Sequence, residues 1–476
     1  MVSNKRDISN IKINNFGIIK YADIDISPFT VLIGPNSCGK SFAAKLIHCL
    51  SLTPDEDISK IGLKHVSDSF NSLIENNSQV FELIDEINNY LKTNPSIKSE
   101  PLKIPIEKLD SIVDEGIVGY LSEILSEMIV NQFEEELDDL INFNEDFFKI
   151  KIRDNELYKK IGEKFVLNVN NIVMIEDEEP KDKGRLLMSV FTDDENVVFN
   201  MESILLNENN LDDFSIFALL YQTIGLSIFE NILLENSFYI PAERSDLIID
   251  RKLLTRKILD KSDTSKNQSE VLVNILNIDP SKKSIFYDIA CELEAEFSDI
   301  SVGIDDSNIF NSVSYMNSQT NDIVSSRLLS TSIHEMSIFI LYLKYVLNEG
   351  DLLIIEEPEA HLHPANQRLL VKYFVKAINN GLKILITTHS DYIISQIDNM
   401  INLNSIPKEK LNDLNYVAED ILDFKDISIY NFKKNSNGSF NSEKIIINED
   451  GFIEDNFSKI ADELYDETIF IRNLSS

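Results

Sequence analysis

The chain contains no tryptophan and only three cysteines among its 476 residues. Without tryptophan, it has no indole ring to stack on nucleic-acid bases or to anchor a membrane interface. The cysteines, Cys38, Cys49 and Cys291, are too few for a disulfide framework, and none lies in a C-x-x-C pair. This cysteine usage is typical of proteins in a reducing compartment, so we expect a cytoplasmic location.

Long hydrophobic runs are also missing. The N-terminal sequence lacks the apolar segment of a secretory signal. The most apolar helical stretch, residues 214–234, is interrupted by Gln222 and Glu230. We therefore interpret it as a buried core helix and predict no membrane partner.

Basic residues are scarce relative to acidic ones. The chain has 44 Lys and Arg against 80 Asp and Glu, which gives a formal net charge of −36. Such a charge argues against a surface that coats nucleic acid or an anionic membrane, but it does not exclude a local basic patch. Much of the acidic excess lies in the predicted insertions and the tail, which favours a protein partner for these parts and leaves DNA contact local or indirect.

The order of apolar and polar segments predicts an α/β fold with a mixed central sheet flanked by helices. Residues 1–54 would form the N-terminal part of the main domain, and residues 236–400 its C-terminal part. Residues 55–235 would form an insertion, helical to about residue 148 and then made of short strands. Prolines at 95, 101 and 105 break the helical part, which excludes a long coiled coil. Residues 401–476 would pack on the main domain as a tail.

The segment Gly34–Ser41 reads G-P-N-S-C-G-K-S and matches the Walker A pattern G-x-x-x-x-G-K-[ST]. An apolar strand precedes it and a helix follows, which is the context that a phosphate-binding loop requires. Glycines let backbone N–H groups converge on phosphate, and the helix N-terminus adds a positive dipole end. Lys40 would reach the phosphates of ATP, and Ser41 would bind Mg²⁺. The predicted nucleotide-binding residues here are Gly34, Asn36, Ser37, Cys38, Gly39, Lys40, Ser41 and Phe42.

Two further apolar strands end in chemically active residues. The run at residues 352–355 leads into Glu356 and Glu357, a Walker B arrangement. Successive strand side chains point oppositely, so Glu356 can bind Mg²⁺ while Glu357 activates the attacking water. The run at residues 383–388 leads into His389, which we expect to contact the γ-phosphate or the water. Lys40, Glu357 and His389 are the predicted catalytic residues.

Together these motifs resemble ABC-type ATPases of the SMC and OLD-nuclease branch, and in particular stand-alone AAA-like ATPases of prokaryotic anti-phage defence. The resemblance rests on the following segments: Gly34–Ser41, Glu356–Pro364 (E-E-P-E-A-H-L-H-P), Thr387–Ser390, Asn15–Gly17, Tyr239–Ser245 and Asp391–Tyr392. It implies an ABC/SMC-type P-loop ATPase head that binds ATP and Mg²⁺ and forms a homodimer or higher oligomer around ATP. Such an ATPase would control a protein effector, a nuclease or a toxin.

The resemblance also assigns segments that depart from the family pattern. Residues Ala360–Pro364 would occupy the D-loop, which faces the partner subunit. Tyr239–Ser245 stands near the Q-loop position but lacks the glutamine, which leaves Glu243 and Arg244 as candidates there. The signature motif would correspond to the segment from Ser330 to Glu335. Its Ser330 and Ser332 would contact the partner's ATP, and Ser332 stands where a glycine is expected. Because a Cβ hinders close backbone approach, we expect slow or partner-dependent hydrolysis.

Other functions are weighed against this one. A DNA-repair or chromosome-maintenance ATPase is the main alternative. The altered signature motif and the missing Q-loop glutamine argue against a transporter subunit. A nuclease of the OLD type would need a D-x-D pair after Ser390, and we find none. A zinc site formed by His361, His363, Glu357 and Glu359 is disfavoured because H-x-H alone is not a zinc pattern. The position of Cys38 at a helix start would lower its pKa and favour a reactive thiol, but we prefer the interpretation that a small residue is tolerated at this point of the loop.

Overall fold

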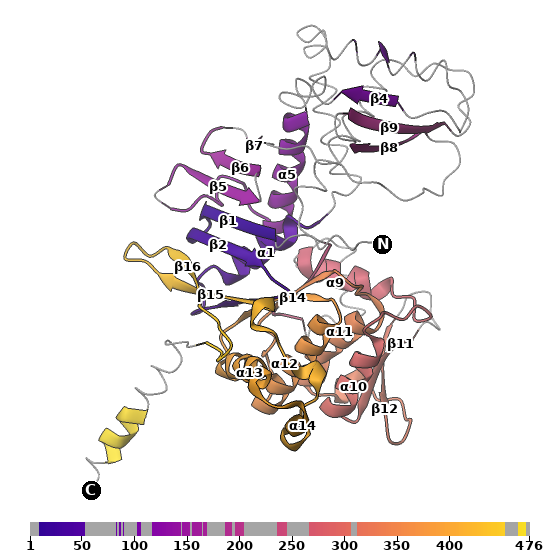
Figure 1. The fold of residues 1–476 in the computed structure, drawn as a ribbon, viewed down its shortest axis with the longest axis vertical. Helices are drawn as coiled ribbons and strands as arrows, with labels where there is room; N and C mark the ends of the chain where they lie inside the picture. Colours follow the sequence, from indigo (N-terminus) through magenta and orange to yellow (C-terminus); the bar gives the residue numbers. More distant parts are fainter. Residues whose placement is uncertain are drawn as a thin grey trace. The chain divides into compact units, whose positions relative to one another are not determined.

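The computed structural model describes residues 9–52, 102–105, 117–143, 145–152, 155–163, 165–168, 186–192, 196–203, 236–244, 266–305, 312–452 and 465–472, with residues 82, 85, 86 and 89 (Figure 1). The chain forms two compact units. The first combines Met1–Asn10, Ala22–His48 and Glu235–Ser476, and the second combines Ile11–Tyr21 and Cys49–Leu234.

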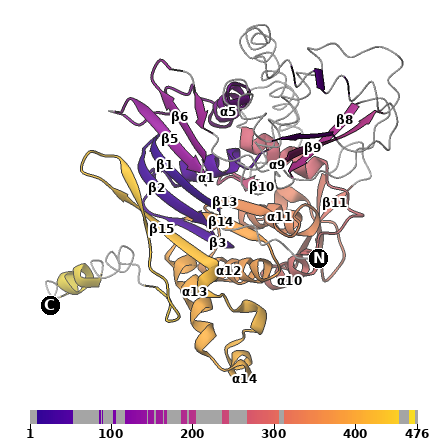
Figure 2. The same ribbon diagram turned by 45° about the horizontal axis from the view of Figure 1, so that its top comes forward.

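The first unit is built on a mixed sheet (Figures 1 and 2). Its strands follow the order β10 (Ser237–Ile240), β13 (Leu352–Glu356), β14 (Lys383–Thr388), β3 (Phe29–Ile33), β15 (Ile427–Lys434), β16 (Phe440–Lys444) and β2 (Ile19–Ile26). The pairs from β10 to β15 are all parallel, whereas β15 and β16 are antiparallel. The carboxyl ends of β3, β13 and β14 therefore meet at one edge, where α/β proteins bind ligands.

Helices and a hairpin complete the first unit. Their bounds are α1 (Lys40–Cys49), α9 (Lys266–Leu276), α10 (Tyr287–Phe297), the β11 (Ile300–Asp305) and β12 (Ser312–Asn317) hairpin, α11 (Thr331–Tyr345), α12 (Pro364–Asn379), α13 (Asp391–Asn402) and α14 (Lys408–Leu411). None of the helices in the described part of the chain is long and apolar enough to cross a membrane.

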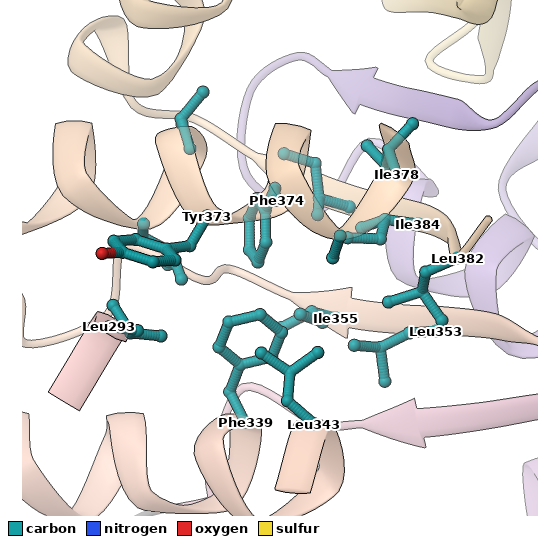
Figure 3. Close-up of a cluster of buried hydrophobic side chains, with 14 of the residues drawn as sticks. Leu293, Phe339, Leu343, Leu353, Ile355, Tyr373, Phe374, Ile378, Leu382 and Ile384 are labelled. Atoms are coloured by element: carbon teal, nitrogen blue, oxygen red, sulfur yellow. The ribbon is translucent and has the colours of Figure 1, made fainter. Parts of the chain in front are cut away.

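One apolar core joins the helices from α9 to α14 to the sheet. Figure 3 shows side chains of α11, α12, β13 and β14 meeting in this core, Phe339 and Phe374 among them. The Phe374 ring lies 5.2 Å from that of Phe339 and 6.3 Å from that of Phe29, both edge to face. Alternate residues of the strands face this core, so Leu353 and Ile355 point into it. The side chains that alternate with these two along β13, Glu356 among them, face the other side of the sheet.

The described part of the second unit contains two sets of strands. One set belongs to the eleven-stranded sheet and has the order β1 (Ser9–Phe16), β5 (Phe147–Ile152), β6 (Asn155–Lys160) and β7 (Val166–Asn168), all antiparallel. The other joins β4 (Leu102–Pro105), β9 (Asn196–Ser203) and β8 (Leu186–Thr192), also antiparallel. The helix α5 (Val118–Phe133) buries Leu121, Leu125 and Ile129, which are spaced four residues apart.

The predicted mixed α/β architecture is confirmed. The periodic segment around residues 117–133 is the helix α5, but most of the remaining predicted helical stretch at 55–148 lies outside the described residues. So does the predicted core helix at 214–234. The C-terminal segment does more than pack on the domain, because its strand β15 pairs with β3 inside the sheet. The predicted bounds of the four segments stay predictions.

Candidate functional site

The loop between β3 and α1 has a strongly curved backbone. Gly34 has a φ angle of 140°, Ser37 of 57° and Gly39 of 99°. A Cβ built on Gly34 would lie 2.9 Å from the carbonyl oxygen of Phe432 and 3.1 Å from the sulfur of Cys38. A side chain is therefore excluded at Gly34 both by backbone conformation and by the neighbouring strand β15. Successive turns of this kind aim N–H groups into an anion-binding concavity.

Lys40 lies across the same loop and is only 5% exposed. Its Nζ donates to the carbonyl oxygens of Gly34 and Pro35, each at 2.9 Å. These two neutral acceptors hold the ammonium group over the loop, where the oxygens of a phosphate would compete for it. The lysine is thus already directed toward the anion-binding concavity.

Cys38 lies inside the same loop. Its side chain is 1% exposed, and burial raises the pKa of the thiol although Lys40 opposes the shift. The helix start does not produce the predicted low pKa, because removing the thiolate from water outweighs it. A reactive Cys38 thiol is therefore not supported, and the residue is a small buried side chain, as the preferred interpretation of the sequence had it.

Glu356 ends β13 on the sheet face opposite the α11–α12 core. It is 7% exposed, and its Oε1 is buried without a hydrogen-bond partner among the described residues. Tyr239 of β10 is paired with Ile354, two residues before Glu356 on the same face. Burial and the neighbouring Glu356 carboxylate raise the pKa of Tyr239 well above its ordinary value. A buried carboxylate oxygen with an unused lone pair is a ligand suited to a hard cation.

Glu357 follows in a backbone conformation that is rare for a residue with a side chain, with a φ angle of 42°. Its N–H donates to the carbonyl oxygen of Thr387 at 2.9 Å, which fixes the turn to the end of β14. The Glu357 carboxylate is half-buried and lies 3.7 Å from Nδ1 of His389. The two predicted catalytic side chains are therefore neighbours.

Glu359 is a member of this site that the sequence analysis considered only as part of a disfavoured zinc site. Its Oε1 accepts from the Thr388 hydroxyl and from the His389 N–H, each at 2.8 Å, and lies 3.3 Å from His389 Nδ1. The carboxylate is 6% exposed. Glu359 thus holds the exposed His389 ring by its backbone and by one ring nitrogen. The only sequence signal was a third acid in the run E-E-P-E.

Arg244, from the Tyr239–Ser245 segment, contacts the backbone of the Walker B turn. It is 3% exposed, and its Nε forms an ion pair with Glu335 of α11 at 2.6 Å. Its Nη1 donates to the carbonyl oxygen of Glu356 at 2.8 Å. Burial lowers the pKa of Arg244, and the surrounding carboxylates, Glu335 foremost, oppose that shift. Glu243, the other candidate, is exposed.

The segment Ala360–Pro364 connects Walker B to α12. His361 has a φ angle of 58°, and His363 is the N-cap of α12 because its Nδ1 accepts from the N–H of Ala365 at 3.3 Å. Both histidines are exposed. In the described part of the chain, no group of three or more His, Cys, Asp or Glu side chains is arranged to hold a metal ion.

The predicted signature residues lie at the start of α11. Ser330 is the N-cap and is exposed, and its Oγ is 2.8 Å from the Oγ of Ser332. No residue of this turn has a positive φ angle among the described positions. The backbone therefore does not require a glycine at 332, so any effect of Ser332 comes from its side chain.

The residues present fit ATP and Mg²⁺. The curved loop excludes a Cβ at Gly34, Lys40 is directed over it, and Glu356 has an unused buried oxygen. The edge of the sheet brings Glu356, Glu357 and His389 together at the ends of β13 and β14, with the Gly34–Ser41 loop at the end of the adjacent strand β3. Ser330 and Ser332 form a separate group, and in the described part of the chain their side chains are hydrogen-bonded only to each other.

Comparison with solved structures finds similar chains of several kinds. They include an Smc head bound to the C-winged helix domain of ScpA (TM-score 0.39, 11% identity, 92% of this chain and 97% of that chain). They also include the SMC head domain from Thermotoga maritima (0.32, 9%, 93% and 99%) and the recombination mediator protein RecF (0.36, 10%, 92% and 99%). Comparison with curated proteins gives no match.

A family model described as "AAA ATPase domain" matches residues 7–394. The match includes the phosphate-binding loop, both Walker B glutamates and His389. It spans most of the 476 residues. With the P-loop geometry and this match together, the chain belongs to the AAA ATPase domain family.

Proposed function

We propose that this protein is an ATPase that dimerises around two ATP molecules and thereby controls a protein effector in prokaryotic anti-phage defence. The observation that carries the proposal is the meeting of Glu356, Glu357 and His389 at the strand ends beside the Lys40 loop. A lysine-bearing phosphate loop next to a half-buried carboxylate is the arrangement that phosphoryl transfer to water requires.

Each residue has a distinct part in this proposal. Lys40 and the loop N–H groups would bind the phosphates, and Ser41 with Glu356 would hold Mg²⁺. The ion, when bound, would neutralise charge on the phosphate oxygens. Glu357 would take the proton of the attacking water, since its carboxylate is only half-buried and adjoins His389. His389, held by Glu359, would present its free ring edge toward the terminal phosphate.

The proposed dimer rests on the signature segment at the start of α11. Ser330 and Thr331 are exposed at the N-terminus of the 15-residue helix α11, where N–H groups lack intrahelical acceptors. A second copy could offer its bound nucleotide to this helix start. The effector and the defence setting rest on the resemblance and on the net charge of −36, which favours a protein partner over direct DNA coating. A cytoplasmic location accords with three free cysteines.

The test is a Glu357→Gln variant incubated with ATP and Mg²⁺. Replacing a general base lowers the rate by about 10²- to 10⁴-fold, so ATP should stay bound and the dimer should accumulate. Light scattering after size exclusion would measure the mass, and mass spectrometry would identify a copurified effector. Lys40→Ala is the control and should stay monomeric. A Glu357→Gln protein that binds ATP but remains a monomer contradicts the proposal, and DNA-stimulated hydrolysis would favour the DNA-maintenance alternative.

A further inference from the structure

Arg244 makes an unusual set of contacts with the backbone that carries the proposed general base. Its Nη1 donates to the carbonyl oxygen of Glu356 at 2.8 Å, and its Nη2 donates to those of Glu357 at 3.2 Å and Pro358 at 3.4 Å. A further bond from Nη1 reaches the carbonyl of Pro241 at 3.2 Å. One guanidinium group therefore binds three consecutive carbonyls of the turn that follows β13.

The same guanidinium group also contacts the helix that begins at the signature serines. Its Nε lies 2.6 Å from Oε2 of Glu335, and both side chains are almost completely buried. Glu335 is the fifth residue of α11, one turn beyond its N-cap Ser330. A displacement of the start of α11 would therefore move Glu335, and through its ion pair Arg244, and through the hydrogen bonds of Arg244 the Glu357 turn.

We infer that Arg244 is a positioning residue that couples the Glu357 turn to the Ser330–Ser332 helix start. This inference rests on the proposed function, in which these two parts serve different ATP molecules. The Glu357 turn would act on the chain's own ATP, and the helix start would contact the partner's ATP. The planar guanidinium has fixed donor directions, so it transmits a shift where a flexible lysine would absorb part of it.

The role fits the physical character of the contact. A buried ion pair adds little net stability compared with apolar side chains of similar size, although breaking it on one side is strongly destabilising. Stability alone therefore does not explain a charged pair at this position. The network has two discrete ends that different ligands would bias, which is what energetic coupling between sites requires.

The chain supplies a matched control on the same helix. Lys344 of α11 forms a second buried ion pair with Glu294 at 2.7 Å, and it also donates to the carbonyl of Val302. The two side chains of this pair are about as buried as those of Arg244 and Glu335. The groups that Lys344 contacts, however, belong to α10 and β11 rather than to the Walker B turn. Its removal perturbs α11 without severing the proposed connection.

The experiment compares two double variants, Arg244→Met with Glu335→Met and Lys344→Met with Glu294→Met. Removing both charges avoids leaving one buried ion unpaired, so both proteins should fold. For each, a fluorescent ATP analogue measures affinity in dilute monomer, and sedimentation measures how much ATP with Mg²⁺ strengthens the dimer. Thermal unfolding reports structural damage separately. Arg244→Lys is a third variant that keeps the charge but not the planar fork.

We expect the Arg244 and Glu335 double variant to bind ATP as the wild type does. Its ATP-dependent gain in dimer affinity should fall by about 5- to 150-fold, the usual range for coupling between sites. The Lys344 and Glu294 double variant should keep the full ATP-dependent gain in dimer affinity, even if its melting temperature falls as far as that of the Arg244 and Glu335 double variant. The gain of Arg244→Lys should lie between those of the two double variants. Equal gains in both double variants would overturn the coupling while leaving the ATPase dimer intact. A wild-type protein that shows no ATP-dependent dimer would overturn the proposed function itself.

Discussion

Gly34→Ala is expected to distort the phosphate-binding loop and to remove ATP binding. The φ angle of Gly34 is 140°, a region that residues with a side chain occupy only at a cost of about 1–3 kcal/mol. The added Cβ would also lie 2.9 Å from the Phe432 carbonyl oxygen, and relieving such overpacking costs about 1–3 kcal/mol. The two terms sum to about 2–6 kcal/mol, a large part of the about 5–15 kcal/mol that stabilises a typical protein.

The control for this prediction is Gly350→Ala. Gly350 also has a positive φ angle, 87°, but a Cβ there would meet nothing within 4 Å. It therefore reports the backbone strain alone, without the contact to a neighbouring strand. Urea unfolding measures the stability of both variants, and titration with a fluorescent ATP analogue measures their nucleotide affinity.

We expect Gly350→Ala to lose some stability and to keep its ATP affinity. Gly34→Ala should lose more stability or, if the loop shifts instead, should lose ATP binding with less change in the urea midpoint. The reasoning is refuted if Gly34→Ala binds ATP with wild-type affinity and unfolds at the same urea concentration as Gly350→Ala. In that case the Phe432 contact does not confine the loop.

Three further predictions concern other residues. Glu359→Gln keeps an acceptor for Thr388 and His389 and should unfold near the wild-type urea concentration, whereas Glu359→Ala should lose about 1–3 kcal/mol per orphaned donor; equal urea midpoints would contradict this. Ser332→Gly removes the Cβ at the exposed helix start and should accelerate single-turnover ATP hydrolysis, and an unchanged rate would count against a hindering role. Burial raises the pKa of Asp420 above 3.8, so the folded state favours its protonated form and wild-type stability should fall as pH rises above that value. Asp420→Asn should lack this loss in urea unfolding at about pH 4 and about pH 7, and parallel pH curves would show that another group is responsible.

The local chemistry of the site could be read from the sequence because each part depends on neighbours in the chain. An apolar run followed by Gly34–Ser41 specifies a strand, a curved loop and a helix start within a few residues. Glu356, Glu357 and His389 each follow an apolar strand. The pattern therefore assigned each of them to the end of a strand, and the pairing of β13 with β14 in the sheet brought them together.

The order of the strands could not be read in the same way. The strand β15 comes from the C-terminal segment and pairs with β3, so that Phe432 confines Gly34. The sequence around residue 430 does not predict the pairing of β15 with β3, because the pairing of strands far apart in the chain depends on the whole sheet. The segment was therefore expected only to pack on the domain surface.

Burial decided the properties that sequence patterns describe least well. The helix start near Cys38 predicted a low pKa, yet the enclosure of the thiol raises it. Arg244 was only a candidate in a segment without the expected glutamine, and its ion pair with Glu335 joins positions far apart in the chain. The sequence by itself determined which residues can bind and cleave a nucleotide, since those motifs are local. Only the tertiary structure decided how they are held and connected, since desolvation and buried ion pairs arise when distant segments enclose a side chain.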